Sequence, residues 1–463
     1  MVVVSVLTGL AVVWLIAVLH WYLWRRLVRD TTREGSRWRA PGGVVLAVGA
    51  TAMCGAFAAM LRGVDWAAWR WLSWPGFLWA ALFLYLLIGV LAGEIVRPLL
   101  LRGLVIRDAG TGAPAGAGAA APAGDANLTA PAAAPVEPHM TPEPVGAAVG
   151  EGPGTDTSRI AVPGPAGPPV VGPVVPSPAE PAVPARRPIS RRALISRLAA
   201  GATVIGAGAV VATGAYGVLD GPAVRRVTVP LAKLPVQAHG LRITLVSDLH
   251  LGPALGRAFC ERVVRTVNDT RPDLIAVVGD LADGTVADLR ADTEPLAGLS
   301  ARLGAYYVPG NHEYLSDADA WLARAAELGM TVLLNDRVSL PDFDLAGVDD
   351  PKGVAIGRGP DFGAALDGRD TGRACVLLAH QPVVVHESVA HGVDLQLSGH
   401  THGGQLWPGN LLARLANPTV AGLELYGGTA LYVTRGAGAW GPPVRVAAPS
   451  DITVLELASL QGV

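Results

Sequence analysis

The sequence contains few cysteines and carries almost no net charge. Its three cysteines, Cys54, Cys260 and Cys375, are far apart and show no CxxC spacing, which argues against a disulfide framework and against a thiolate zinc site. Cys260 and Cys375 could pair in an oxidising compartment, but a small, buried apolar role is commoner for such residues. The formal net charge of −2 gives no electrostatic basis for specific nucleic-acid binding, so none is expected.

Apolar residues, in contrast, make up 51% of the 463 residues. That share is high for a soluble protein and indicates membrane segments. Three apolar runs, at about 2–24, 41–61 and 76–96, have the length of roughly 20 residues that a helix needs to cross a bilayer. The sequence therefore predicts an N-terminal membrane region, residues 1–107, with three transmembrane helices.

The chain changes composition after this region. Residues 108–187 are mainly proline, alanine, glycine and valine, and we expect a disordered linker because such a segment buries too little to offset its ordering entropy. Residues 188–220 combine clustered arginines with a fourth apolar stretch. Ser190–Ile195 resembles a twin-arginine export signal, although the basic end of an ordinary membrane span would look similar. Either way, a retained fourth transmembrane helix leads into residues 221–463.

Arginines are distributed unevenly among the segments that connect the apolar runs. The first connection holds Arg25, Arg26, Arg29, Arg33, Arg37 and Arg39, the second holds Arg62 and Arg70, and Arg97, Arg102 and Arg107 follow the third run. By the positive-inside rule, the first connection and the linker are cytoplasmic. The N-terminus and residues 221–463 are therefore expected outside the cytoplasm.

The last region shows short apolar strands that alternate with amphipathic stretches. Strands are expected at 241–247, 273–279, 305–309, 374–379 and 395–398, and helices near 258–268, 286–303 and 318–329. This alternation predicts an α/β domain. Polar residues follow each strand, at the carboxyl ends where ligand-binding groups gather in such sheets.

These polar residues have the chemistry of metal ligands. The candidates are Asp248, His250, Asp280, Asn311, His380, His400 and His402. Oxygen and imidazole ligands without thiolate suit Mn, Fe, Zn or similar divalent ions. Seven ligands exceed the need of one ion, whereas two ions about 3.5–4 Å apart, bridged by a carboxylate and a water, would use them all. A single histidine after a strand commonly has a structural role, but here a candidate ligand follows each of the five expected strands.

Five motifs occur together and in order: Asp-x-His at 248–250, Gly-Asp at 279–280, Gly-Asn-His-Glu at 310–313, the strand-end His380, and Gly-His-Thr-His at 399–402. This set resembles the calcineurin-like metallophosphoesterase superfamily. The string at 397–405 resembles in particular its membrane-associated bacterial branch. The resemblance covers about residues 241–457.

The resemblance implies a fold and a role for each motif residue. The implied fold is a two-sheet sandwich flanked by helices, here preceded by the α-helical transmembrane region. Asp248, His250 and His402 would bind one metal ion, Asn311, His380 and His400 the other, and Asp280 would bridge them. His312 and Glu313 are the implied catalytic residues: His312 as a proton donor that is not a ligand, and Glu313 beside it to orient the ring.

The expected function is hydrolysis of phosphomonoesters or phosphodiesters by a bridging hydroxide that the metal ions activate. The protein would be a multi-pass protein of a bacterial cell membrane with an extracytoplasmic catalytic domain. That compartment suggests lipid head groups, wall phosphodiesters or nucleotides as substrates and leaves the oligomeric state open. Asp283 is expected to cap the following helix.

One alternative belongs to a different functional class. The three-helix unit could act as a sensor or transport partner, with the outer domain as a ligand-binding module. No candidate metal ligand is missing, which argues against a binding-only domain. Glu94, near the inner end of the third run, is the one carboxylate of that run, and such a position more often marks a membrane boundary than an ion path.

Overall fold

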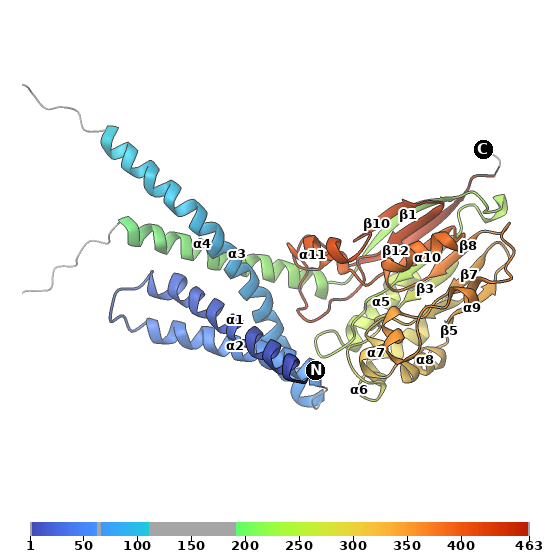
Figure 1. Ribbon diagram of the computed structural model, residues 1–463, viewed down its shortest axis with the longest axis horizontal. Helices are drawn as coiled ribbons and strands as arrows, with labels where there is room; N and C mark the ends of the chain where they lie inside the picture. The colour runs from blue at the N-terminus through green and yellow to red at the C-terminus, as the bar shows by residue number, and fades with distance from the viewer. Residues whose placement is uncertain (1, 63–65, 111–190, 462–463) are drawn as a thin grey trace, which may run out of the picture. The chain divides into compact units, whose positions relative to one another are not determined.

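The computed structural model describes residues 2–62, 66–110 and 191–461. The predicted linker therefore lies outside the described residues, apart from 108–110, which continue a helix instead of starting a disordered segment. Residues 2–62, 66–103 and 191–461 belong to one compact unit. Figure 1 labels the helices and strands where space allows.

Long apolar helices make up the N-terminal part. They are α1 (Val2–Leu23), α2 (Arg39–Arg62), α3 (Trp66–Gly110) and α4 (Arg191–Leu219), and α1 continues as a π-helix, η1 (Trp24–Arg29). Each contains a stretch that is long and apolar enough to cross a membrane: 7–29, 39–60, 71–96 and 193–219. These stretches overlap the predicted spans. The helix α3 extends beyond its predicted span at both ends.

Glu94 has a charged partner within this helical part. Its carboxylate lies 2.7 Å from the guanidinium of Arg26, which also contacts Asp30 at 3.1 Å. An ion pair between half-buried side chains neutralises the charge that an apolar environment disfavours. The structure thus accounts for Glu94 without an ion path.

The C-terminal part contains two six-stranded sheets. The first has the order β1 (Ala223–Leu231), β12 (Asp451–Ser459), β2 (Arg242–Val246), β3 (Leu274–Val278), β4 (Ala305–Val308) and β5 (Thr331–Val332). The second has the order β10 (Gly422–Tyr426), β11 (Thr429–Val433), β9 (Leu395–Ser398), β8 (Cys375–Leu378), β7 (Asp344–Gly347) and β6 (Asp336–Ser339). The central strands β2, β3 and β4 are parallel to one another, as are β7, β8, β9 and β11.

The two sheets pack face to face, and helices cover their outer faces. In β3, Leu274 and Val278 join Val376 of β8 in the core between the sheets. The alternate residue Ile275 packs on the other side, in a core that contains Val263 of α5. Figure 1 shows the strands running alongside one another with α5 (Arg257–Asp269), α6 (Val286–Thr293), α8 (Ala318–Glu327), α9 (Phe362–Leu366) and α10 (Val385–Ala390) around them. The implied sandwich flanked by helices is confirmed.

One predicted helix ends earlier than the sequence pattern suggests. The expected helix at 286–303 is α6 followed by a 3₁₀ helix, η3 (Glu294–Gly298). Pro295 explains the change, because proline has no amide hydrogen and its ring clashes with the preceding turn of an α-helix. Cys260 and Cys375 are unpaired, buried side chains in separate cores, which confirms their apolar role over the alternative of a disulfide.

Candidate metal centre

All the candidate ligands lie on loops that follow the carboxyl ends of strands. The loop after β2 carries Asp248 and His250, those after β3 and β4 carry Asp280 and Asn311, and those after β8 and β9 carry His380, His400 and His402. Within each sheet these strands are parallel neighbours. The carboxyl ends of parallel neighbours meet at one sheet edge, so the topology gathers the seven side chains.

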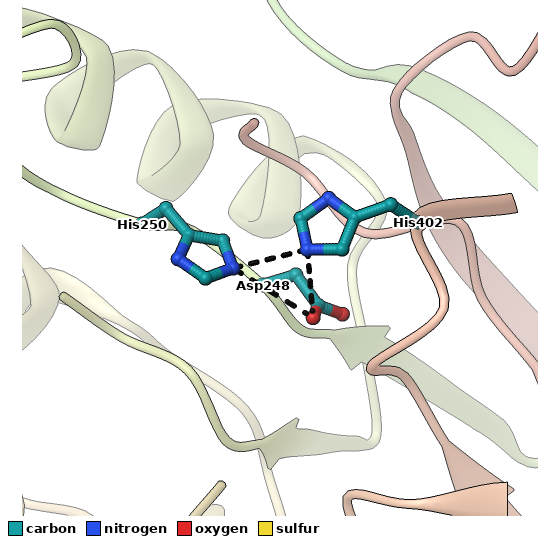
Figure 2. A group of neighbouring side chains, drawn as sticks. All are labelled: Asp248, His250 and His402. Atoms are coloured by element: carbon teal, nitrogen blue, oxygen red, sulfur yellow. Dashed lines mark hydrogen bonds and ion pairs between the residues drawn. The ribbon is translucent and has the colours of Figure 1, made fainter. Parts of the chain in front are cut away.

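The first ligand group is formed by Asp248, His250 and His402 (Figure 2). His402 Nε2 lies 3.3 Å from Asp248 Oδ1 and 3.0 Å from His250 Nε2, and His250 Nε2 lies 4.0 Å from the same carboxylate oxygen. All three residues are buried, at most 8% exposed. Their donor atoms converge on one point, as ligands of a single ion do.

The second ligand group contains Asp280, His380, His400 and Asn311. His380 Nε2 lies 3.2 Å from Asp280 Oδ2 and 3.1 Å from Asn311 Oδ1, which in turn lies 2.8 Å from His400 Nδ1. The donor atoms of the aspartate and the two histidines all lie within 4.8 Å of one another. Two imidazoles, a carboxylate and an amide oxygen form a ligand set suited to a second divalent ion.

Asp280 faces both groups. Its Oδ2 is 3.6 Å from His250 Nε2 on one side and 3.2 Å from His380 Nε2 on the other. Its Oδ1 accepts a hydrogen bond of 2.9 Å from the amide of His312, which holds the carboxylate in this orientation. The position of Asp280 therefore fits a carboxylate that bridges two ions.

The charge states of three of the candidate ligands also fit metal binding. Burial raises the pKa of Asp280, but the adjacent His380 outweighs it and holds the pKa well below the ordinary value. Burial and the neighbouring His380 lower the pKa of His400 to about 4, and burial likewise lowers the pKa of His402 to about 4. Ionised carboxylates and neutral imidazoles are the forms that bind metal ions.

Hydrogen bonds hold two of the histidines with one ring nitrogen directed into the site. His380 Nδ1 donates to the carbonyl oxygen of Val278 at 2.8 Å, and His250 Nδ1 donates to Asp283 Oδ1 at 2.8 Å. Each ring therefore turns its Nε2 toward its ligand group. A carboxylate or carbonyl behind the ring is the usual partner of a metal-bound histidine.

The role of Asp283 differs from its predicted one. Thr285, not Asp283, caps α6 by accepting from the amide of Asp288. Besides His250, Asp283 Oδ1 accepts from His312 Nδ1 at 2.8 Å. Burial raises the pKa of Asp283, but the two imidazoles outweigh it and lower the pKa below its ordinary range. The prediction for Asp283 is wrong because its spacing from α6 resembles that of a cap, while its partners come from distant loops.

Glu313 contacts backbone amides, whereas the ring of His312 contacts Asp283. Its carboxylate is fully buried and accepts from the amides of Asp280 at 3.0 Å, Leu281 at 2.7 Å and Gly310 at 2.7 Å. The expectation that Glu313 orients the ring of His312 is therefore wrong. Its contacts instead join the loops after β3 and β4, which hold Asp280 beside the second ligand group.

His312 lies at the edge of the metal centre. Its ring is 4.7 Å from that of His250 and 5.8 Å from that of Trp440, both edge to face. Burial lowers the pKa of His312, but the hydrogen bond to Asp283 and the charge of Asp280 outweigh it and raise the pKa to about 9. Because Nδ1 bonds Asp283, Nε2 is the nitrogen left for a substrate.

The backbone around the ligands adopts an uncommon conformation. Five non-glycine ligands have φ between 45° and 71°: Asp248, His250, Asp280, His400 and His402. This left-handed region is unfavourable for residues with a Cβ atom, and it persists where surrounding contacts enforce it, often at functional sites. Gly310 and Gly399 allow the close approach, because a Cβ atom would collide with Asp280 Oδ1 at the first and with Ser247 Oγ at the second.

A buried arginine outside the five motifs supports the last ligand loop. Arg445 donates to the carbonyl oxygens of His402, Gly438, Ala448 and Arg435 at 2.7–3.1 Å, and its Nη2 lies 3.1 Å from His402 Nδ1. Its distance in sequence from the motifs hides this contact. The other histidines of the described chain, His20, His239, His386 and His391, contact residues outside the ligand groups.

Known proteins share this domain. The calcineurin-like phosphoesterase family profile matches residues 241–404. An "Uncharacterized metallophosphoesterase" of Aquifex aeolicus is 35% identical over 239 residues, which are 50% of this chain and 91% of that protein. The chain belongs to the calcineurin-like phosphoesterase family. All five motifs that carry the resemblance begin within the matched region.

Two further relatives of this calcineurin-like phosphoesterase are named as transmembrane proteins. A "Transmembrane protein with metallophosphoesterase domain" of Danio rerio is 40% identical over 259 residues, 52% of this chain and 59% of that protein. A protein of the same name in Bos taurus is 40% identical over 253 residues, 51% of this chain and 57% of that protein. The chain thus spans somewhat more than half the length of these two relatives, which come from animals, so the resemblance is not confined to bacteria.

Replacing Asp283 by asparagine tests its part in this calcineurin-like phosphoesterase. The change removes the charge that both His250 and His312 contact at 2.8 Å. We expect metal affinity and hydrolysis to fall by about 10–100-fold, the usual effect of losing such a partner. Titrating metal into chelator-treated protein would measure the first and a rate assay the second. Asp288→Asn, at an exposed carboxylate nearby, is the control, and equal behaviour of the two variants would contradict the assignment.

Proposed function

We propose that the chain is a metal-dependent hydrolase of phosphoester bonds, anchored in a membrane with its active site on the extracytoplasmic side. The observation that carries the hydrolase is the place of Asp280, whose Oδ2 lies 3.6 Å from His250 and 3.2 Å from His380. One carboxylate that serves two ligand groups is the feature of a binuclear centre for in-line displacement at phosphorus. The name metallophosphoesterase, which the relatives carry, supports the same reaction.

Two divalent ions, such as Mn, Fe or Zn, would supply an acidified bridging water as the nucleophile and positive charge to offset that of the phosphoryl oxygens. Asp248, His250 and His402 would hold one ion. Asn311, His380 and His400 would hold the other, and Asp280 would face both. The buried carboxylate of Glu313 accepts a hydrogen bond of 3.0 Å from the backbone amide of Asp280 and so positions that residue.

His312 is proposed as the proton donor to the leaving oxygen. Its Nδ1 is held by Asp283 at 2.8 Å, which directs Nε2 away from that carboxylate. Trp440 packs edge to face on the ring, with the centroids 5.8 Å apart, and limits its rotation. A proton donor fixed in this way typically contributes about 10²–10⁴ in rate.

The proposed orientation rests on the arginines that flank the helices. The connection between α1 and α2 is rich in arginine, the connection between α2 and α3 is poor in it, and the end of α3 is rich again. The rule that cytoplasmic connections carry the excess of Lys and Arg then places α4 with its C-terminal end outside. A periplasmic-type reporter fused after Val463 is expected to be active and a cytoplasmic one inactive. The reverse result would contradict the orientation.

The reaction itself is tested on the purified full chain. Metal analysis is combined with a substrate panel of aryl phosphomonoesters, aryl phosphodiesters, lipid phosphoesters, wall phosphodiesters and nucleotides. We expect bound divalent metal and hydrolysis of at least one class, lost after chelation and restored by metal. A chain that binds metal but hydrolyses none of them would instead favour the ligand-binding module considered above.

A further inference from the structure

An apolar helix lies exposed on the surface of the catalytic domain. This helix, α11 (Gly409–Ala416), carries Leu411, Leu412 and Leu415, which are 56%, 71% and 85% exposed. At about 100° per residue, these side chains lie within one 100° sector of the helix, the pattern of an amphipathic helix. Trp407, just before the helix, is 47% exposed. No residue of α11 is buried, so most of this leucine face is exposed.

The leucine face is connected directly to the metal centre. The loop that leaves His402 packs tightly on the start of α11, because a Cβ atom at Gly404 would collide with the backbone of Asn410. In the same loop, the side chain of Gln405 bonds both to the amide and to the carbonyl of Trp440, at 3.0 and 2.9 Å. Trp440 contacts His312. A continuous chain of contacts therefore links α11 to His312 through Gln405 and Trp440.

Contacts within the compact unit connect this region with the apolar helices. The amide of Arg445 donates to the carbonyl oxygen of Gly214 in α4 at 3.2 Å. The hydroxyl of Tyr85 in α3 donates to the carbonyl oxygen of Trp407 at 2.9 Å. Val444 is fully buried in a cluster with residues of α3 and α4. The segments that carry Trp407 and Arg445 are thus held against two candidate membrane spans.

The contact with α4 lies near the end of that candidate span. Gly214 lies five residues before the end of α4 at Leu219, which is about 7.5 Å along a helix that rises 1.5 Å per residue. Leu219 and the start of β1 at Ala223 are separated by 220–222 only, a tether of at most roughly 14 Å. The catalytic domain, and α11 with it, is therefore tethered close to the end of a candidate membrane span.

We propose that α11 inserts its leucine face into the lipid leaflet beside the catalytic domain, so that the metal centre acts on the phosphoester of a lipid head group. The second half of this statement rests on the proposed function. Interfacial helices of this kind bury an apolar face at the boundary between head groups and acyl chains. The phosphates of a bilayer lie at that boundary, and the loop that carries the candidate ligand His402 packs directly on the start of α11.

The insertion is tested without any assay of activity. The full chain carrying Cys54→Ala is labelled with an environment-sensitive dye at Leu412→Cys and reconstituted in phosphatidylcholine vesicles. The native Cys260 and Cys375 are buried and do not compete for the label. Lipids brominated on their acyl chains are expected to quench this dye. The same dye at Ile356→Cys, a position 66% exposed, should not be quenched. Equal quenching at both positions, or cross-linking of α11 between two chains in its place, would overturn the insertion.

The substrate is tested with Leu412→Asp/Leu415→Asp and the control Ile356→Asp in the same vesicles. The probes are phosphatidyl-p-nitrophenol in the bilayer and bis-p-nitrophenyl phosphate in solution. We expect the double variant to hydrolyse the lipid at least about tenfold more slowly, because the two leucines that would be buried in the lipid are lost. Hydrolysis of the soluble probe should be unaffected. An equal loss on both probes would overturn the lipid assignment. If the wild-type chain hydrolyses neither probe, the lipid assignment fails; if it also hydrolyses no member of the substrate panel, the proposed function fails as well. The quenching result still decides the insertion.

Discussion

Replacing Asp280 by asparagine is expected to reduce bound metal from two ions per chain to one or none and to lower phosphodiester hydrolysis by at least ~10³-fold, the upper end of what one positioned group contributes. The reason is geometric. One oxygen of Asp280 lies between His250 at 3.6 Å and His380 at 3.2 Å, so its loss weakens both ligand groups together. Metal analysis of the purified full chain and a rate assay with an aryl phosphodiester would measure the two effects.

The matched control for this variant is Asp269→Asn. Asp269 is an exposed carboxylate at the end of α5, so its replacement makes the same chemical change away from the site. We expect its metal content and rate to equal those of the unaltered chain. His400→Ala provides a contrast, because His400 belongs to the second ligand group only and should remove one ion. Two ions and full activity in Asp280→Asn would contradict the shared-carboxylate arrangement.

The ligand positions could be predicted because strand ends are local features of sequence. Apolar runs of four to seven residues followed by aspartate or histidine predict both a buried strand and the polar group after it. The predicted strands at 273–279 and 395–398 coincide with β3 and β9 to within one residue. Parallel strands then bring their carboxyl ends to one edge. The sequence pattern alone therefore locates Asp280, His400 and His402 after the ends of these two strands.

The partners of those ligands could not be predicted, because they depend on contacts between distant segments. Asp283 lies 33 residues from His250 along the chain, and its sequence neighbours suggest only a helix cap. Arg445 lies 43 residues from His402. Likewise, β1 and β12 pair in parallel although they begin at Ala223 and Asp451. Local propensity carries no information about such pairs, which the packing of the whole domain determines.

Replacing His312 by glutamine is expected to lower the rate by about 10²–10⁴-fold while both ions stay bound, because the loss of a proton donor removes a transition-state interaction. His312 belongs to the site through Asp283, which it contacts at 2.8 Å, and its backbone amide still holds Asp280 in the variant. Glutamine keeps a polar side chain but cannot deliver a proton. Metal content and kcat of the purified chain would be measured side by side.

The leaving group supplies the decisive control for His312. A good leaving group, such as p-nitrophenolate, needs little protonation, whereas an alkoxide needs it strongly, so the variant should lose much less rate on an aryl ester than on an alkyl ester. A variant that only disturbs folding or metal binding would lose both rates equally. Asp280→Asn is expected to show that equal loss, since its effect comes through the ions. If His312→Gln behaves like Asp280→Asn on the two esters and also loses metal, His312 is a ligand and not a proton donor.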